Sequence, residues 1–246
     1  MIICVDGTGV YDGAQYKKDM ENSFCNQICA AKGFGKAFYF EGPGGLGLTT
    51  RGTGNRALNL IKEYYQNPVI IRESPLYLAG YSRGAACVLQ VAKWLQEDYP
   101  AMRVKGLFLF DPVNRDLNLN MDGLGTPSNV KTVYIILRDP GVEWVDFPND
   151  PDRYGRRWMG TCAWTPQDKA ATKVGLHEVI QHASHGAAGG CAWRERPMDR
   201  IGEGSAAFAM NKALKAEQLH VALEAKTFPP MDLPKSNTKI KITFKR

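Results

Sequence analysis

The sequence has no apolar stretch long enough to cross a bilayer as a helix, which takes about 20 consecutive apolar residues. Its first apolar run, Ile2–Val5, ends at Asp6 and is too short for the core of a secretory signal peptide. Internal repeats and low-complexity tracts are missing as well. We therefore expect a protein that is cytoplasmic as synthesised and folds around an ordinary hydrophobic core.

Cysteine pairs with the spacing of a zinc site are also missing. Cys25 and Cys29 lie four positions apart, but no CxxC pair accompanies them, so we expect no metal and no other cofactor. Without a secretory signal, reduced and mostly buried thiols are expected rather than disulfides. The six cysteines are Cys4, Cys25, Cys29, Cys87, Cys162 and Cys191.

An excess of charge of one sign is missing from most of the chain. Lys and Arg number 31 against 25 Asp and Glu, which gives a net charge of +6. Five of the basic residues follow residue 234, and without them 26 basic residues face 25 acidic ones. In the segment 235–246, lysines alternate with Ile240, Ile242 and Phe244, which predicts a half-exposed edge strand protected against pairing with another chain. We expect no nucleic-acid partner, and a peripheral contact with an anionic membrane is the remaining alternative. The five residues are Lys235, Lys239, Lys241, Lys245 and Arg246.

What the chain does have is the composition of a globular protein, with 246 residues of which 44% are hydrophobic and 23% charged. Short apolar runs alternate with longer helical patterns, and several runs are continuous, which is typical of parallel strands covered on both faces. We predict one α/β domain over residues 1–246, with a mainly parallel sheet flanked by helices. The expected strands are Ile2–Val5, Ala37–Phe40, Leu76–Ala79, Gly106–Phe110 and Thr132–Leu137. The expected helices cover residues 17–32, 55–66, 84–97 and about 204–224.

Residues 141–170 follow none of these patterns. They hold aromatic side chains among prolines, glycines and charges, which is typical of a long loop or a small insertion. The part from 144 to 164 could cover an apolar pocket as a lid, or it could pack its aromatics onto the core. The aromatic residues are Trp144, Phe147, Tyr154, Trp158 and Trp164.

The sharpest motif is Gly80-Tyr81-Ser82-Arg83-Gly84, which follows an expected strand and opens an expected helix. This strand–turn–helix context is the one that a nucleophile elbow requires. A turn that lifts a serine clear of the sheet brings backbone too close for a β-carbon at positions 80 and 84. The alternative is an ordinary glycine-rich turn with a helix-capping serine. The motif favours Ser82 as a nucleophile.

A nucleophilic serine needs a histidine as base and a carboxylate as acid. In chains with a nucleophile elbow, the acid follows the serine in the sequence and the histidine follows the acid. All four histidines, His177, His182, His185 and His220, lie after Ser82. His185 heads a loop of small residues, whereas His177 and His182 lie in a helix-like stretch and His220 lies in the late helix. Two carboxylates end the next two strands, Asp111 and Asp139, and either could be the acid or a simple turn former before proline.

Two glycine-rich turns follow the first two strands. Backbone N–H groups of the turn at Gly7 and Thr8, together with that of Arg83, are candidates for an oxyanion hole. Residues 42–47 match GxGxxG formally, but the chain runs on to Gly54 before a helix is expected, which disfavours a dinucleotide loop.

In this order the motifs resemble the bacterial α/β-hydrolase-domain family of uncharacterised function related to type VI secretion phospholipase effectors. The resemblance runs from Ile2 to about Leu219 and rests on the Asp6-Gly7-Thr8 turn, the glycine-rich loop, Gly-Tyr-Ser-Arg-Gly-Ala, a strand ending in Asp and His-x-x-x-Gly-Gly. It implies Ser82 as nucleophile, His185 as base and Asp111 as acid. Asp111 is followed by Pro-Val where the family has Thr-Val, and His185 by Gly-Ala-Ala where the family has Ser-Asp-Val. Asp139 therefore stays an alternative acid. Effectors of the resembled family are exported without a cleaved signal, so export by such a route is compatible with the sequence.

These observations predict a serine hydrolase that cleaves carboxylic esters, including lipid or phospholipid acyl esters, through an acyl-enzyme. The expected partner is a small-molecule or lipid ester, and the sequence leaves the oligomeric state open. One alternative is a binding module that keeps the fold without catalysis, in which case the histidines should lie far from Ser82. Another is a nucleotide-binding protein that uses the 42–54 loop.

Overall fold

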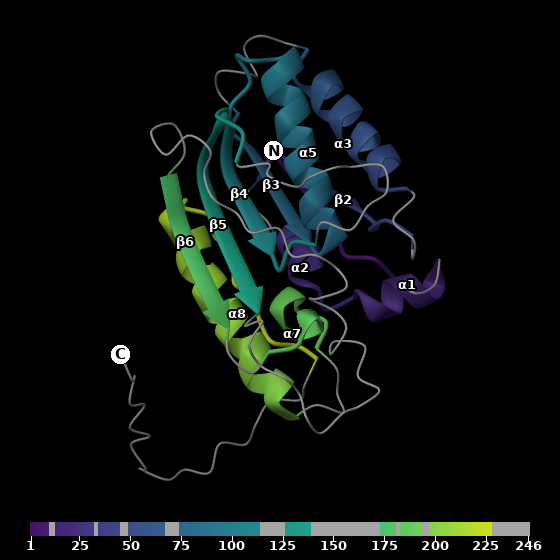
Figure 1. The fold of residues 1–246 in the computed structure, drawn as a ribbon, viewed down its shortest axis with the longest axis vertical. Helices are drawn as coiled ribbons and strands as arrows, with labels where there is room; N and C mark the ends of the chain where they lie inside the picture. The colour runs from purple at the N-terminus through teal and green to yellow at the C-terminus, as the bar shows by residue number, and fades with distance from the viewer. Residues whose placement is uncertain are drawn as a thin grey trace.

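The computed structural model places the chain in two layers of helices around one sheet (Figure 1). It describes residues 1–9, 13–31, 34–44, 49–66, 74–113, 126–138, 173–180, 183–192 and 197–227. Several sequence predictions lie outside these residues: the 141–170 insertion with its lid, the 239–245 strand, Asp139, His182 and Cys162.

Within the described residues the sheet has six strands in the order β2-β1-β3-β4-β5-β6, and each neighbouring pair is parallel. The five strands expected from the sequence are confirmed, the last three of them with two or three further residues. Continuous apolar runs form them because both faces of the sheet are covered. The strands are β1 (Ile2–Val5), β2 (Ala37–Phe40), β3 (Leu76–Tyr81), β4 (Val104–Phe110), β5 (Val130–Arg138) and β6 (Lys173–Ile180).

Strand β6 corrects one prediction, because His177 lies in this strand and not in a helix. The strand lies at the edge of the sheet and pairs only with β5 among the described strands. Most of its described side chains are exposed, so the segment lacks the continuous apolar run that marks the inner strands. Because charged residues and a glycine interrupt its apolar residues, a search for apolar runs does not predict this strand.

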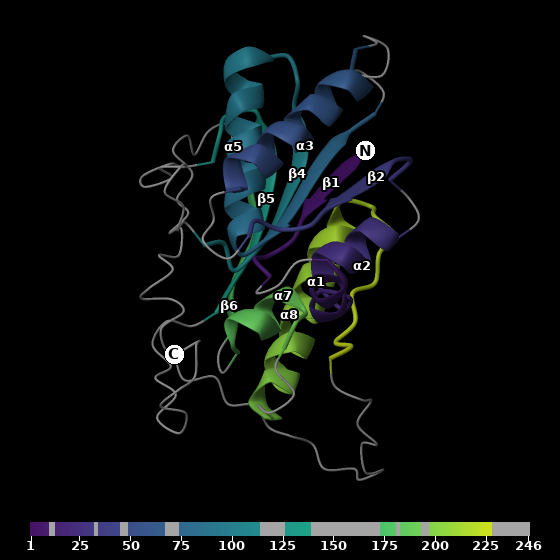
Figure 2. The ribbon, with the colours of Figure 1, turned by 90° about the vertical axis from the view of Figure 1, so that its right-hand side faces the viewer.

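The helices cover the sheet on both faces (Figure 2). On one face, α3 (Thr50–Tyr64) packs on α5 (Arg83–Asp98), and α5 packs on β3 and β1. On the other face lie α2 (Phe24–Ala30) over β1 and β2, and α8 (Pro197–Ala216) over β5 and β6. Each face has its own buried apolar cluster, one including Phe24, Phe108 and Met210 and the other including Ile61, Val88 and Leu107.

Helix bounds differ from the sequence predictions in three places. The expected 17–32 helix is two helices, α1 (Ala14–Asp19) and α2, because the Ser23 side chain accepts a hydrogen bond from the Asn26 N–H and caps a new helix. Helix α8 begins and ends earlier than expected, so His220 lies beyond its end. Helix α3 begins at Thr50 rather than at 55.

The early start of α3 has a packing reason. Gly54 lies so close to α5 that an added β-carbon would be 3.0 Å from the Trp94 ring. The Cys87 thiol also donates to the Thr50 carbonyl across this contact. Small residues therefore serve helix-to-helix packing here, although glycine is a poor helix former in isolation. The 49–54 segment is part of a packed helix and not an extension of the glycine-rich loop.

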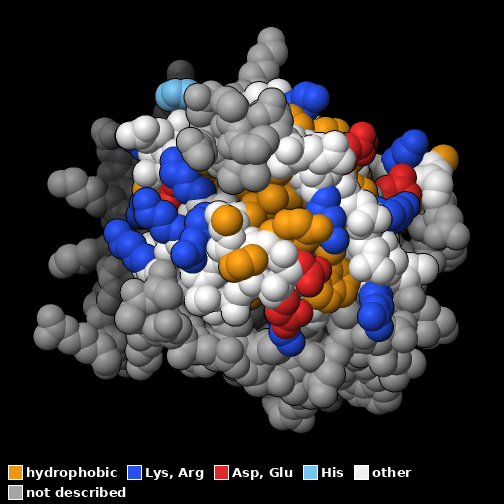
Figure 3. All heavy atoms as spheres, turned by 90° about the horizontal axis from the view of Figure 1, so that it is seen from above, with side chains coloured by type: hydrophobic (Ala, Val, Ile, Leu, Met, Phe, Trp, Pro, Cys, Tyr) orange, Lys and Arg blue, Asp and Glu red, His pale blue; other side chains and the backbone are white. Residues whose placement is uncertain are grey.

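Basic side chains gather on the end of the molecule where the strands begin, as Figure 3 shows for that face. Several of them have local partners. Lys105, near the start of β4, pairs with Glu217 at an Nζ–Oε2 distance of 3.8 Å. Lys62 lies over the Tyr99 ring, 4.9 Å from its centroid. Lys105 thus has an acidic neighbour and Lys62 an aromatic one.

The strand order and the turn after β3 make this an α/β-hydrolase-like fold, as the sequence predicts. Because all strands are parallel, their carboxyl ends meet at one edge of the sheet, where ligands bind in open α/β sheets. The five described cysteines are free thiols. Among the described residues, no helix combines the length and the apolar character that a bilayer crossing requires.

Candidate active site

Ser82 occupies a strained turn between β3 and α5. Its backbone has φ 56 and ψ −127, a combination that residues with a β-carbon rarely adopt. A β-carbon at Gly80 would lie 2.5 Å from the Ala85 Cα, and one at Gly84 would lie 2.2 Å from the Asp6 carbonyl oxygen. The two glycines are therefore required by close backbone approach, which is the reason given for them from the sequence.

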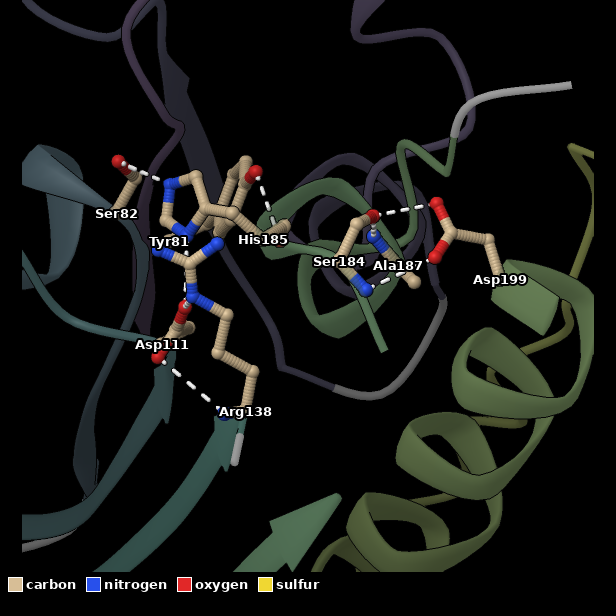
Figure 4. Close-up of polar contacts among 8 residues, drawn as sticks. All are labelled: Tyr81, Ser82, Asp111, Arg138, Ser184, His185, Ala187 and Asp199. Carbon is tan, nitrogen blue, oxygen red and sulfur yellow. Dashed lines mark hydrogen bonds and ion pairs between the residues drawn. The ribbon is translucent and has the colours of Figure 1, made fainter. Parts of the chain in front are cut away.

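His185 faces this serine from the other side of the sheet edge (Figure 4). It is the first residue of the short helix α7 (His185–Gly189), not part of a loop as the sequence suggested. Ser184 caps this helix by accepting from the Ala187 N–H at 3.0 Å, and the run of small residues lets the helix lie close to Tyr81. The His185 Nε2 atom lies 2.8 Å from the Ser82 Oγ atom.

Asp111 follows β4 with a positive φ of 37 and a fully buried side chain. Its Oδ2 atom lies 2.8 Å from the His185 Nδ1 atom. The Asp111 N–H donates to the Ile136 carbonyl at 2.7 Å, which ties this turn to the neighbouring strand. The structure thus brings together Ser82, His185 and Asp111, three residues proposed from the sequence.

The hydrogen-bond chemistry of this row assigns the proton on the imidazole. An ionised carboxylate only accepts hydrogen bonds, so the Nδ1 atom of His185 carries the proton that is shared with Asp111. The Nε2 atom is then an acceptor for the hydroxyl of Ser82. In this tautomer the imidazole can take the serine proton during attack on an electrophile, and the carboxylate stabilises the imidazolium that forms.

Arg138 is a site residue that sequence reasoning missed. It ends β5, its side chain is buried, and its Nε atom lies 3.2 Å from the Asp111 Oδ2 atom. Its backbone N–H also donates to the Asp111 Oδ1 atom at 3.4 Å. The buried carboxylate is therefore held by an imidazole and a guanidinium together. The available signal was an arginine directly after the apolar run Val133–Leu137.

Tyr81 and the Ser184–Asp199 pair fix the position of His185. The Tyr81 ring lies 4.9 Å from the His185 ring, and its hydroxyl donates to the His185 carbonyl at 3.1 Å. Ser184 donates from both its N–H (2.9 Å) and its hydroxyl (2.5 Å) to the buried carboxylate of Asp199 on α8. Helix α8 therefore holds the residue directly before the histidine. The sequence reasoning did not single out Tyr81, Ser184 or Asp199.

The two hydrogen bonds from Ser184 to Asp199 lead to a first prediction. Asp199→Ala leaves the two buried donors of Ser184 without this acceptor, which costs about 1–3 kcal/mol for each unsatisfied group. We expect a melting temperature lowered by several degrees, at about 2–4 °C per kcal/mol for a chain of this size. Asp98→Ala, at the exposed end of α5, is the control and should leave the melting curve unchanged. Equal melting temperatures for both variants would contradict a structural role for the hydrogen bonds between Ser184 and Asp199.

The candidate oxyanion residues lie on the other side of Ser82. A β-carbon at Gly7 would be 3.2 Å from the Ser82 Cβ, so the Gly7 turn lies directly against the serine. Arg83 is the first residue of α5 and directly follows Ser82, so its backbone N–H lies at the N-terminal end of this helix. The Arg83 Nη1 atom donates to the Thr8 Oγ1 atom at 3.0 Å and joins the two segments. The Gly7 N–H, however, donates to the Asp6 Oδ1 atom at 2.9 Å.

Of the other three histidines, His220 is exposed beyond α8, His177 belongs to the edge strand β6, and His182 lies outside the described residues. Within the residues that the structure describes, no group of three or more His, Cys, Asp or Glu side chains is arranged to hold a metal ion.

Known structures resemble this one at low sequence identity. The NocB thioesterase domain from the nocardicin cluster matches with a TM-score of 0.41 and 15% identity, over 87% of this chain and 94% of that chain. A protein described as a YdeN-like hydrolase, from Pectobacterium atrosepticum, matches with a TM-score of 0.29 and 12% identity, over 82% of this chain and 90% of that chain. No protein-family model and no curated protein matches the sequence. Likenesses at this level say nothing about substrate or reaction, which must be argued from the residues of the site.

Proposed function

We propose that the protein is a serine hydrolase that cleaves carboxylic esters, with Ser82 as nucleophile, His185 as base and Asp111 as acid. One observation supports this above all: the imidazole lies 2.8 Å from the serine hydroxyl on one side and 2.8 Å from the carboxylate on the other. The serine at its centre stands in a strained turn, and strain of this kind persists where the surrounding structure enforces it.

In the proposed reaction, the Ser82 Oγ atom attacks the acyl carbon and its proton passes to the His185 Nε2 atom. The tetrahedral intermediate collapses when the imidazolium gives that proton to the leaving alcohol, which leaves an acyl-serine. Water then attacks the acyl-serine with His185 again as base, and the acid is released with the free serine. Asp111 orients the imidazole and stabilises its charged form throughout, and Arg138 holds Asp111 in place.

We include lipid and phospholipid acyl esters in this proposal. The support is the resemblance of the sequence motifs to phospholipase effectors of type VI secretion and the aromatic segment 144–164, which lies outside the described residues. A lipid substrate would entail a peripheral contact with a membrane. The same resemblance makes export by a route without a cleaved signal part of the proposal.

Two rival functions are less well supported. A binding module that has lost catalysis would not need the histidine within hydrogen-bond reach of the serine, as it is here. In the nucleotide-binding alternative, Gly42 would serve to approach a phosphate. In this structure Gly42 packs against the Gly7 turn, where a β-carbon would lie 1.9 Å from the Gly7 carbonyl oxygen. That close approach accounts for the glycine without a ligand.

Labelling with a fluorophosphonate probe tests the proposal directly. The wild type should be labelled covalently, and Ser82→Ala should not be labelled. Ser205→Ala, which removes a half-buried serine hydroxyl on α8, is the matched control and should be labelled like the wild type. A series of p-nitrophenyl esters of increasing chain length then defines the acyl preference, and release of fatty acid from phospholipid vesicles tests the lipid part. An unlabelled wild type that leaves all these esters intact would refute the hydrolase proposal.

A further inference from the structure

Asp6, just after β1, is a buried carboxylate that the proposed reaction does not use. Its side chain has no exposed surface. It accepts three hydrogen bonds: from the Gly7 N–H at 2.9 Å, from the Tyr39 hydroxyl at 2.8 Å and from the Ser23 hydroxyl. Among the described residues, no lysine or arginine forms an ion pair with it. Hydrogen bonds alone therefore stabilise this carboxylate, and one of them comes from the turn beside Ser82.

The carbonyl of Gly7 is held as firmly as its N–H. The Tyr16 hydroxyl donates to the Gly7 oxygen at 2.8 Å and accepts from the Gly42 N–H at 2.6 Å. Gly42 follows β2, so the Gly7 oxygen faces the β2 side of β1. Both polar groups of Gly7 are thus bound to fixed partners in the interior.

A trans peptide unit is planar, with its C=O and the following N–H pointing in opposite directions. Because the Gly7 oxygen faces the β2 side, the N–H of Thr8 is directed the other way. The strand on that other side of β1 is β3, which ends at Tyr81, directly before Ser82. The partners of Gly7 therefore set the direction of the Thr8 N–H, and that direction is toward the serine.

We propose that Asp6 and Tyr16 are positioning residues that aim the Thr8 N–H at the oxyanion formed on the acyl group attacked by Ser82. Thr8 and Arg83 supply the two backbone donors, and Gly7, whose N–H is committed to Asp6, does not. This inference rests on the proposed function, because an oxyanion forms only if the serine attacks an acyl group.

The ionisation of Asp6 gives the network a dependence on pH. Burial raises the pKa of Asp6 to about 6, while its three hydrogen-bond donors act in the opposite direction. Below that pH the carboxyl group takes up a proton, loses acceptor capacity and holds the Gly7 N–H less firmly. The aim of Thr8 should therefore be kept above about pH 6 and lost below it. The other titratable groups near Asp6 are Tyr16, Tyr39, Cys4, Cys25 and Cys191, and burial together with the negative charge of Asp6 raises the pKa of each.

Three variants test the proposal through ester hydrolysis. Asp6→Ala removes the acceptor for Gly7, and Tyr16→Phe removes the donor to its carbonyl. Loss of one oxyanion donor costs about 10²–10³ in kcat, and a misdirected donor should cost about 10- to 100-fold with KM nearly unchanged. Asp6→Asn keeps an oxygen for Gly7 but cannot titrate. It should already show at pH 8 the reduced kcat expected of the wild type below about pH 6, because an amide resembles a protonated carboxyl group in having one acceptor oxygen and one donor group. In the acid limb of log kcat against pH, its slope should be smaller by one proton than that of the wild type.

The matched control is Tyr65→Phe, which removes a buried tyrosine hydroxyl bonded to the Ser74 carbonyl at the far end of β3. It should leave kcat and the acid limb unchanged. Circular dichroism first establishes which variants are folded, and if Asp6→Ala is not, Tyr16→Phe and Asp6→Asn carry the test. Folded Asp6→Ala or Tyr16→Phe with wild-type kcat would overturn the positioning role, as would an acid limb for Asp6→Asn equal to that of the wild type.

Failure of this inference can be told apart from failure of the proposed function. If the fluorophosphonate labels wild-type Ser82 and the variants turn over like the wild type, the hydrolase stands and the positioning role falls. If wild-type Ser82 is not labelled, both fall together. Labelling of the wild type together with slow turnover in Asp6→Ala and Tyr16→Phe supports both the proposed function and the positioning role.

Discussion

Asp111→Asn should lower kcat for ester hydrolysis by about 10⁴-fold, the loss that follows from a wrong histidine tautomer in serine hydrolases. The amide of an asparagine next to the Nδ1 atom of His185 would donate where the carboxylate accepts. The imidazole would then keep its proton on Nε2 and present it to Ser82, where it could not take up the serine proton. KM should change little, because the acid does not contact the substrate.

The measurement is steady-state hydrolysis of a short-chain p-nitrophenyl ester at pH 8. Asp98→Asn, at the exposed end of α5, makes the same chemical change away from the site and should keep wild-type kcat. Arg138 is expected to remain beside position 111, so melting curves should be compared as well, because the guanidinium loses its charged partner. A loss of less than tenfold in a folded variant would contradict the role of Asp111 and transfer the test to Asp139→Asn.

The local arrangement around Ser82 was accessible from the sequence because it depends on short-range patterns. An apolar strand, two glycines around a serine and a buried helix predict the turn, and parallel strands bring the ends of β3 and β4 to one edge. Asp111 could be proposed for the same reason. The short distance between the histidine and the serine could not, because α7 is reached only after a long stretch of chain.

The residues that hold the site together were missed because their partners are remote in sequence. In the sequence, Arg138 and Asp199 resemble ordinary charged residues, and Tyr16 resembles an ordinary surface or core tyrosine. Their function becomes visible only in the folded chain, where Tyr16 contacts Gly42 and Arg138 contacts Asp111. The N–H of Gly7, one of the predicted oxyanion donors, is hydrogen-bonded to the Asp6 side chain, a contact that the sequence alone does not show.

Gly84→Ala should lower the free energy of unfolding by at least about 3 kcal/mol, the upper part of the range for an overpacked core. The added methyl group would lie 2.2 Å from the Asp6 carbonyl oxygen and 2.3 Å from that of Val5. Both neighbours are backbone atoms, one in the last residue of β1 and one in the residue that follows it, and β1 is paired on both sides, so neither can rotate away. At about 2–4 °C per kcal/mol, the melting temperature should fall by roughly 6–12 °C.

Gly204→Ala is the matched control for this substitution. Gly204 lies inside α8 with nothing within 4 Å of an added β-carbon. Alanine is the better helix former by about 0.8–1 kcal/mol, so this variant should be as stable as the wild type or more stable. Thermal unfolding of both variants measures the difference. Equal melting temperatures for Gly84→Ala and the wild type would mean that β1 and α5 are not in the close contact seen here.

Gly84→Ala should also lower catalytic activity in the molecules that remain folded. Gly84 and Gly42 approach the Asp6–Gly7 turn from the α5 side and the β2 side. A methyl group at either position displaces that turn, and with it the N–H groups expected to face the oxyanion. In the fraction that stays folded at low temperature, Gly84→Ala and Gly42→Ala should therefore both reduce kcat. Gly204→Ala should not, because its added atom touches nothing that leads to Ser82.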